Sequence, residues 1–241
     1  MLRSTLTYFA ILMALTQCLS QDEKYSSYDQ SKVPFDFTRP DLNQKLPDDL
    51  YEISGITWFE GNIACIEDEH GRLYIWDIVS AEIVKEMKFA KKGDFEGIEV
   101  IGKNIYAIQS NGDLYRFSID SEDVEEVETP FSKKNDVEGL GTMNGQLIIA
   151  CKANGSIDGV KTKDKAIYRL DPDTPDDTQL LMTISLKELR QFIESADRPG
   201  KVHEFDPSAI AFDMINNHLY ILSADQVLVI MSMDGELVEV V

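Results

Sequence analysis

A short phrase that recurs along the chain constrains its fold more than any other feature. The phrase consists of an acidic residue, an apolar residue, a Ser or Glu, a small residue and an apolar residue. It is found at residues 52–56, 94–98 and 136–140 and, more loosely, at 206–210. Its glycines, Gly55, Gly97 and Gly139, are evenly spaced by about forty residues, which is typical of one four-stranded propeller blade per repeat.

Each phrase is followed by the same elements, which are short strands separated by Gly or Asn turns. Strands rich in Ile, Val, Tyr and Trp, with turn residues at regular intervals, indicate hairpins. We therefore predict an all-β fold, a β-propeller of four-stranded blades. The expected blades cover residues 51–89, 94–128, 136–184 and 206–241.

One helix is predicted between the third and fourth repeats, near residues 185–196. Ser185 and Glu188 have the spacing of a capping box, in which each side chain bonds a free amide at the helix start. Leu186, Leu189 and Phe192 then follow at helical spacing and form a narrow apolar face. A helix inserted here explains why the fourth repeat arrives late.

The N-terminus has the pattern of an export signal, predicted over residues 1–20. A basic start precedes an apolar run that is too short to span a bilayer comfortably, and Ser20 suits a cleavage point. Cys18 stands where a bacterial lipoprotein carries its lipidated cysteine, although Gln17 is unusual beside it. A polar spacer is expected at 21–45, with an early strand within 33–37, and the propeller domain at 46–241.

Composition narrows the classes of partner. The chain carries a formal net charge of −20. Such a surface repels a phosphate backbone, so nucleic acid is not expected as a partner, whereas cations are attracted to it. Beyond the signal only Cys65 and Cys151 remain. They stand in similar Ile-Ala-Cys contexts on different blades, and we expect them to be buried and unbridged.

The repeated phrase also predicts a site, because the innermost strand of each blade lines the central channel. Its third position should therefore bring two carboxylates, Glu96 and Glu138, and two hydroxyls, Ser54 and Ser208, to one mouth of that channel. Oxygen ligands of this kind suit Ca²⁺. Residues two positions earlier could support these ligands, namely Asp94, Asp136 and Asp206. Alternatively, each carboxylate caps the backbone of the next blade's loop, and no metal is bound.

These phrases, together with residues 50–58, 207–212 and 219–223, resemble the SdiA-regulated family, also called YjiK/CarP. The resemblance extends over nearly all of 46–241. It implies an exported or membrane-associated propeller, usually six-bladed, that in some members is linked to calcium binding and calcium homeostasis. Family members carry one further Pro-Glu-Gly-Ile phrase and closing strands, so the resemblance implies that this chain is shorter than a full propeller.

The interpretation that follows is an exported, periplasmic or membrane-associated, non-catalytic propeller. It would bind an unidentified ligand or an envelope protein, with Ca²⁺ at the channel, and contact the membrane only through its signal or a lipid anchor. The alternative is a metal-dependent hydrolase of the lactonase or esterase type. No nucleophile elbow or Ser/His/Asp constellation supports catalysis, and none of His70, His203 and His218 lies in a repeated phrase.

Overall fold

The structure, a computed structural model, describes residues 28–196 and 202–241. These residues form four antiparallel sheets of four strands each, every sheet following chain order. The first two sheets are formed by β1 (Ile53–Phe59), β2 (Asn62–Glu67), β3 (Arg72–Asp77), β4 (Glu82–Lys88), β5 (Phe95–Ile101), β6 (Asn104–Gln109), β7 (Leu114–Phe117) and β8 (Val124–Val127). The other two are formed by β9 (Val137–Met143), β10 (Gln146–Cys151), β11 (Lys165–Leu170), β12 (Gln179–Ile184), β13 (Pro207–Asp213), β14 (His218–Ser223), β15 (Leu228–Ser232) and β16 (Leu237–Val240).

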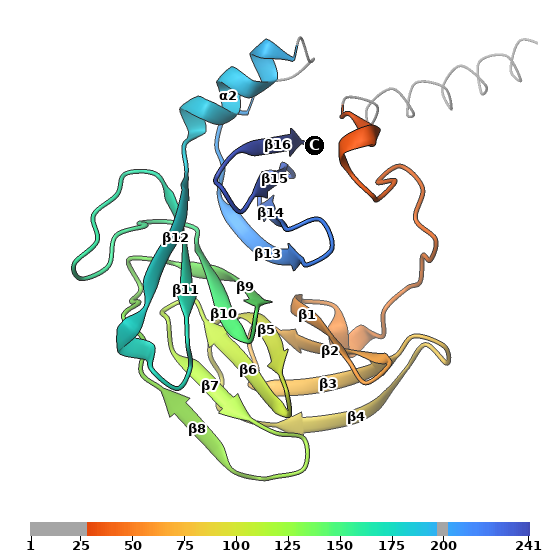
Figure 1. The fold of residues 1–241 in the computed structure, drawn as a ribbon. Coiled ribbons are helices and arrows are strands. Elements are labelled where there is room, and N and C mark those ends of the chain that lie inside the picture. Colours follow the sequence, from red (N-terminus) through yellow and green to blue (C-terminus); the bar gives the residue numbers. More distant parts are fainter. Residues whose placement is uncertain (1–27, 197–201) are drawn as a thin grey trace, which may run out of the picture.

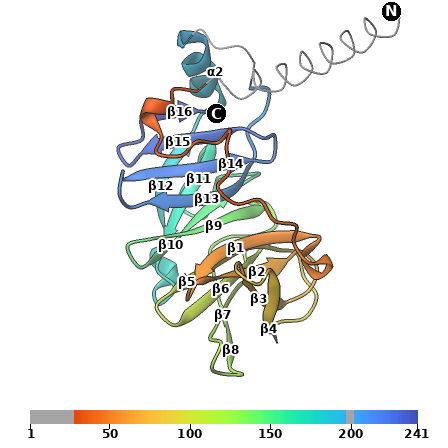
Figure 2. The ribbon, with the colours of Figure 1, turned by 90° about the vertical axis from the view of Figure 1, so that its right-hand side faces the viewer.

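The sheets are the blades of a β-propeller, and the predicted fold class is confirmed. The first strand of each sheet lies toward the middle of the molecule, and β1 contacts β5, β5 contacts β9, and β9 contacts β13 (Figure 1). The four blades form an arc, and in Figure 1 its open side lies opposite β9–β12. Figure 2 shows the same arc from that open side.

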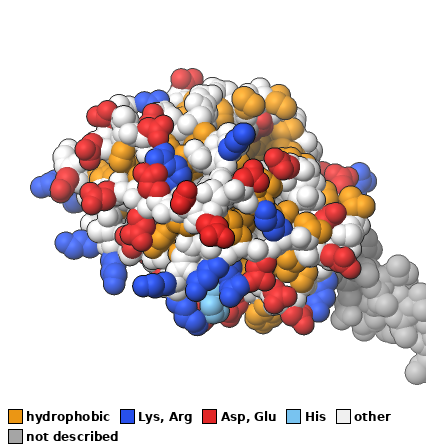
Figure 3. Space-filling view, turned by 90° about the horizontal axis from the view of Figure 1, so that it is seen from below, with side chains coloured by type: hydrophobic (Ala, Val, Ile, Leu, Met, Phe, Trp, Pro, Cys, Tyr) orange, Lys and Arg blue, Asp and Glu red, His pale blue; other side chains and the backbone are white. Residues whose placement is uncertain are grey.

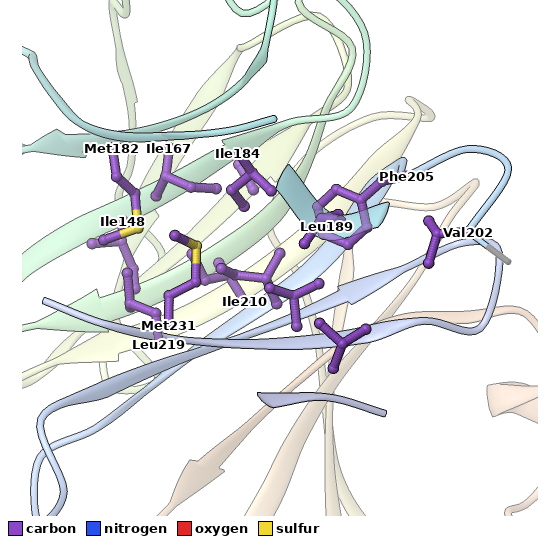
Figure 4. Packing of buried hydrophobic residues seen from close by; sticks show 14 of the residues in the cluster. Ile148, Ile167, Met182, Ile184, Leu189, Val202, Phe205, Ile210, Leu219 and Met231 are labelled. Atoms are coloured by element: carbon purple, nitrogen blue, oxygen red, sulfur yellow. The ribbon is translucent and has the colours of Figure 1, made fainter. Parts of the chain in front are cut away.

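The blades are held together by apolar side chains that fill the spaces between neighbouring sheets. The largest described cluster lies between the third and fourth blades and includes Ile148 and Ile210, both almost fully buried. Figure 4 shows these side chains pointing toward one another from β10 and β13. Because each blade buries one face against the next, the relative positions of the inner strands are fixed by packing.

The predicted helix is present as α2, Leu186–Ser195. Its apolar face is buried where expected, with Leu189 inaccessible to solvent in the cluster of Figure 4. Ser185 is the N-cap residue, but its side chain makes no capping hydrogen bond, so the predicted capping box is not formed. Packing of one face, rather than the cap, therefore accounts for the position of this helix.

The segment before the first blade lies against the last one. The Asp29 backbone N–H donates to Glu239 at 3.1 Å, and the Lys32 ammonium lies 5.7 Å from the centre of the Phe192 ring. The rings of Phe35 and Tyr220 meet edge to face. The strand predicted within 33–37 is absent, because this stretch follows the short 3-10 helix η1 (Gln30–Lys32) and makes side-chain contacts in place of strand pairing.

The two cysteines in the described part of the chain are buried and unbridged, as predicted, and burial raises the pKa of each thiol to about 12. Their supposed equivalence is wrong. Cys151 pairs with Val137 at the start of β9, whereas Cys65 pairs with Ile56 inside β1. The two Ile-Ala-Cys segments are identical in sequence, but strand pairing places them two residues out of register with each other.

Among the described residues, no helix has both the length and the apolar character needed to cross a bilayer.

Candidate functional site

A β-bulge interrupts the innermost strand of every blade at the third position of the repeated phrase. Strand pairing skips one residue in each case, and the extra residues are Ser54, Glu96, Glu138 and Ser208. A bulge leaves its extra residue out of the ladder and turns the side chain away from its usual direction. The third position of the phrase is therefore set apart by backbone geometry in all four blades.

The small fourth residue of the phrase allows the neighbouring blade to approach. A side chain on Gly97 would place its Cβ 2.5 Å from Leu140 Cβ, and one on Gly55 would place it 2.9 Å from the Ile98 backbone nitrogen. Both neighbours are the apolar fifth residue of the next phrase. The phrase is thus explained by two requirements: a bulge that presents a side chain, and a glycine that receives the next blade.

The four bulge residues line one cavity of about 420 Å³ at the centre of the arc. Apolar side chains make up much of the wall, including Ile56, Leu140 and Leu222. Two polar atoms on residues of this wall, Ser54 Oγ and Tyr220 Oη, are buried without a hydrogen-bond partner among the described residues. A cavity of this size with a few polar groups on an apolar wall is typical of small-ligand sites.

The two phrase carboxylates are close enough to influence each other. Burial, followed by the negative charge of Glu138, raises the pKa of Glu96 to about 8. Burial also raises the pKa of Glu138, against the opposing effect of Lys152. The Lys152 ammonium makes an ion pair with Glu138, and sequence reasoning did not identify it. Two acids therefore share one built-in cation, which leaves a deficit of positive charge at this end of the cavity.

The three earlier aspartates of the phrases have different surroundings. Asp94 lies beside Glu96, and its negative charge helps to raise the pKa of Glu96. Asp94 also accepts a hydrogen bond from Ser110 Oγ. In the same way, the negative charge of Asp136 helps to raise the pKa of Glu138. Asp206 instead makes a 2.7 Å ion pair with Lys165. Asp94 and Asp136 thus add negative charge beside the phrase carboxylates, whereas Asp206 is neutralised locally.

Asp206 also belongs to an acidic cluster outside the cavity. Oxygen atoms of Glu204, Asp206 and Asp225 lie within 4.8 Å of one another, a spacing that could hold a metal ion. Glu204 and Asp225 are exposed, and Asp206 is already paired with Lys165. The cluster therefore has the features of a solvated acidic surface. Figure 3 shows, on one face of the molecule, how closely acidic and basic side chains are interspersed.

A further carboxylate, Glu99 on β5, lines the same cavity and was not identified from the sequence. Glu99 Oε2 accepts a hydrogen bond of 2.9 Å from Thr57 Oγ1 on β1. Burial raises the pKa of Glu99 to about 7, opposed by hydrogen bonds from Thr57, Val100 and Thr142. The one available signal was an acidic residue inside the otherwise apolar stretch Ile98–Ile101.

The histidines are the candidate catalytic bases or metal ligands of a hydrolase, and they do not line the cavity. His70 pairs with Glu67 beyond the end of β2, His218 begins β14 opposite Asp213, and His203 is exposed. None of the three is among the residues that line the cavity. Cys18, the predicted lipidation site, and the predicted signal at 1–20 lie outside the described residues.

No family model and no curated protein matches this sequence. Solved structures do match. Glutaminyl cyclase from Myxococcus xanthus aligns with a TM-score of 0.51 and 12% identity, over 78% of this chain and 72% of that one. A Bacteroides thetaiotaomicron protein of unknown function aligns with a TM-score of 0.51 and 11% identity, over 77% of this chain and 42% of that one.

Virginiamycin B lyase from Staphylococcus aureus aligns with a TM-score of 0.49 and 12% identity, over 81% of this chain and 57% of the lyase. This chain thus spans little more than half of the lyase and less than half of the Bacteroides protein. Identities this low show the fold alone. Together with the four blades, the two likenesses with a TM-score of 0.51 define a β-propeller protein.

Proposed function

We propose that this protein is an exported, non-catalytic β-propeller that binds a small ligand in its central cavity. One observation carries the proposal: residues at one repeated position in four blades line a single cavity, and two of them are carboxylates with raised pKa values. Two carboxylates beside a single ammonium group are stabilised in their charged form when a further cation or hydrogen-bond donor binds next to them. An envelope protein placed over the channel face is the other partner compatible with this proposal.

We propose Ca²⁺ as the cation at the phrase carboxylates. Glu96 and Glu138 would hold the ion, and the unpartnered Ser54 Oγ is a further oxygen donor on the same cavity. Lys152 is the one misfit, because its ammonium already occupies Glu138. The donor set therefore fits a hard cation provided that Lys152 moves away, and calcium binding must compete with that ion pair.

The resemblance to the SdiA-regulated family supports export and a link to calcium homeostasis as parts of this proposal. The predicted signal and Cys18 supply the means of export and of membrane attachment. Labelling with a radioactive fatty acid would test attachment, because a lipidated protein loses its label on Cys18→Ala substitution while remaining exported. A protein that is exported without any label would contradict lipidation.

Titration of Ca²⁺ into the metal-free protein tests the calcium site. We expect saturable heat that Glu96→Gln and Glu138→Gln each weaken at least tenfold, which corresponds to about 1.4 kcal/mol. Lys152→Met should strengthen binding, because the competing ammonium is gone, and exposed Glu82→Gln is the matched control. No binding heat, with the same melting temperature in calcium and in chelator, would refute the calcium site.

A metal-dependent hydrolase of the lactonase or esterase type is the second candidate. The observation that favours it is the pKa of about 8 at Glu96, since a general acid or base acts best with a pKa near the working pH. Turnover of aryl esters and lactones in the presence of divalent metals tests it. Hydrolysis that Glu96→Gln abolishes would support this candidate, and turnover equal to that of the Glu96→Gln variant would refute it.

A further inference from the structure

The cavity contains a further carboxyl group, Glu99, which is separate from the carboxylates of the repeated phrase and has no partner cation among the described residues. Glu99 accepts hydrogen bonds from Thr57 Oγ1 at 2.9 Å and from the Val100 backbone N–H at 3.3 Å. These two donors are neutral, and so is Thr142, the third donor to this carboxyl group. Among the described residues, no Lys, Arg or His nitrogen lies within 4.0 Å of the Glu99 carboxylate.

Glu99 and Glu138 make an instructive comparison, because both line the same cavity. Glu138 has Lys152 as its partner cation, whereas Glu99 has none among the described residues. A carboxylate withdrawn from water without a counter-charge is costly, and it is stabilised when a cation is brought to it. The cavity therefore lacks a positive group at Glu99.

Part of the wall of the same cavity is apolar and exposed. Ile56 is 61% exposed and Leu222 is 43% exposed, and both line the cavity. At the equivalent position of the next phrase, Ile98 is only 1% exposed, because the first blade covers it. Ile56 and Leu222 thus present an apolar surface to the cavity on which a ligand body could be buried.

Two hydroxyl groups complete the surroundings. Ser54 Oγ and Tyr220 Oη are buried without hydrogen-bond partners in the described part of the chain, and both residues line the cavity. Unsatisfied buried hydroxyls are costly and are expected to be paired, either by water or by a polar group of a ligand. One carboxylate, an apolar wall and two hydroxyls together specify a ligand with a cationic end, an apolar body and limited polarity.

We propose that the cavity binds a small organic ammonium ion, with the ammonium group on Glu99 and the apolar body against Ile56 and Leu222. This inference rests on the proposed ligand-binding function but does not depend on calcium at the phrase carboxylates. A bare metal ion would gain nothing from the apolar wall, whereas an alkyl or aryl ammonium ion uses both features. The cavity volume of about 420 Å³ is sufficient for such a molecule.

Isothermal titration of the full chain with 2-phenylethylammonium tests this assignment. The controls are 2-phenylethanol, which lacks the charge, and 3-phenylpropionate, which reverses it. We expect saturable binding of the ammonium ion, at least tenfold weaker binding of the alcohol, and none of the carboxylate. Equal affinity for the ammonium ion and the alcohol would overturn the proposal.

Two pairs of variants locate the binding. Glu99→Gln should weaken binding of the ammonium ion at least tenfold, whereas exposed Glu82→Gln should not. Ile56→Lys places a competing cation on the exposed wall and should also block the probe, with Ile215→Lys as its control, because Ile215 is 92% exposed on the turn between β13 and β14. Unchanged affinity in Glu99→Gln and Ile56→Lys, with native circular dichroism, would overturn the assignment to this cavity.

Calcium titration of the same samples separates the two proposals. Saturable calcium binding with no binding of the ammonium ion would refute the ligand class and leave the calcium site standing. Ammonium binding that Glu99→Gln weakens, without any calcium binding, would support the ligand class and refute the calcium site. If neither probe binds, both the proposed class and the proposed calcium site are wrong.

Discussion

The Lys165 ammonium group donates a hydrogen bond to the backbone carbonyl of Lys152, at the junction between the third and fourth blades. At the two preceding junctions, a backbone N–H makes the equivalent bond. Phe95 donates to Asp68 and Val137 donates to Ser110, each at 2.8 Å. The corresponding residue of the fourth phrase is Pro207, which has no N–H to donate. A lysine side chain thus replaces a missing backbone donor.

Removal of this side chain should weaken the junction. Lys165→Met leaves the Lys152 carbonyl without this donor and Asp206 without its ion pair. We expect a loss of about 1–3 kcal/mol in the free energy of unfolding, measured by urea denaturation. Exposed Lys163→Met is the matched control and should change stability by less than about 0.5 kcal/mol. Equal effects of the two substitutions would show that the junction does not depend on Lys165.

The same phrase position should respond differently in adjacent blades. Ile98 is buried against Gly55 of the preceding blade, so Ile98→Ala should lower the free energy of unfolding by about 2–5 kcal/mol. Ile56 is 61% exposed, so Ile56→Ala should cost less than about 1 kcal/mol. Thermal unfolding of the two variants in parallel is the measurement. A large loss at Ile56 would mean that another part of the protein covers the first blade in solution.

The glycine at the fourth phrase position should not tolerate a methyl group. Gly97→Ala would bring Cβ to 2.5 Å from Leu140 Cβ, so one blade must move away from the other. Overpacking of this kind costs about 1–3 kcal/mol, and we expect a lower urea midpoint without a change in fold. Ala209, at the same position of the fourth phrase, is exposed. Ala209→Ser should therefore leave the midpoint unchanged, and a similar fall in both variants would contradict this explanation.

Much of the fold could be predicted from the sequence, because the repeated phrase encodes two local requirements. Gly97 and Gly139 recur where a neighbouring blade approaches, and this spacing identified the blades. The convergence of Glu96 and Glu138 on one cavity also follows from their equivalent places in the repeat. Repetition predicts those features that every blade must share.

The residues that were missed are those that differ between blades. Lys152 occupies a position held by Ser110 in the second blade, so no repeat signal marked it as the partner of Glu138. Glu99 is aligned with Thr57 of the first blade, and its importance depends on contacts between strands. Cys65 and Cys151 were taken as equivalent because both follow Ile-Ala, whereas strand pairing shows that they hold different positions in their blades. Contacts between strands, either within one blade or across two blades, were needed to identify these features.

The raised pKa of Glu96 predicts how stability depends on pH. The folded protein holds the proton of this carboxyl up to a pKa of about 8, whereas the unfolded chain releases it near 4.5. Between these values the native state binds more protons than the unfolded state. The contribution of Glu96 to the free energy of unfolding therefore falls as pH rises from about 4.5 to 8.

Glu96→Gln tests this relationship, since glutamine cannot ionise. We expect the variant, in chelator, to lose part of the decline in stability between pH 5 and pH 8 and to be more stable than the wild type at pH 8. Partial exposure limits the gain to about 1 kcal/mol. The charged neighbours of this carboxyl group, Glu138, Asp94 and Lys152, are unchanged in the variant. Glu82→Gln removes one acidic group at an exposed position and therefore serves as the control for net charge. Urea unfolding across this pH range is the measurement, and parallel curves for Glu96→Gln and Glu82→Gln would contradict the assignment of a raised pKa to Glu96.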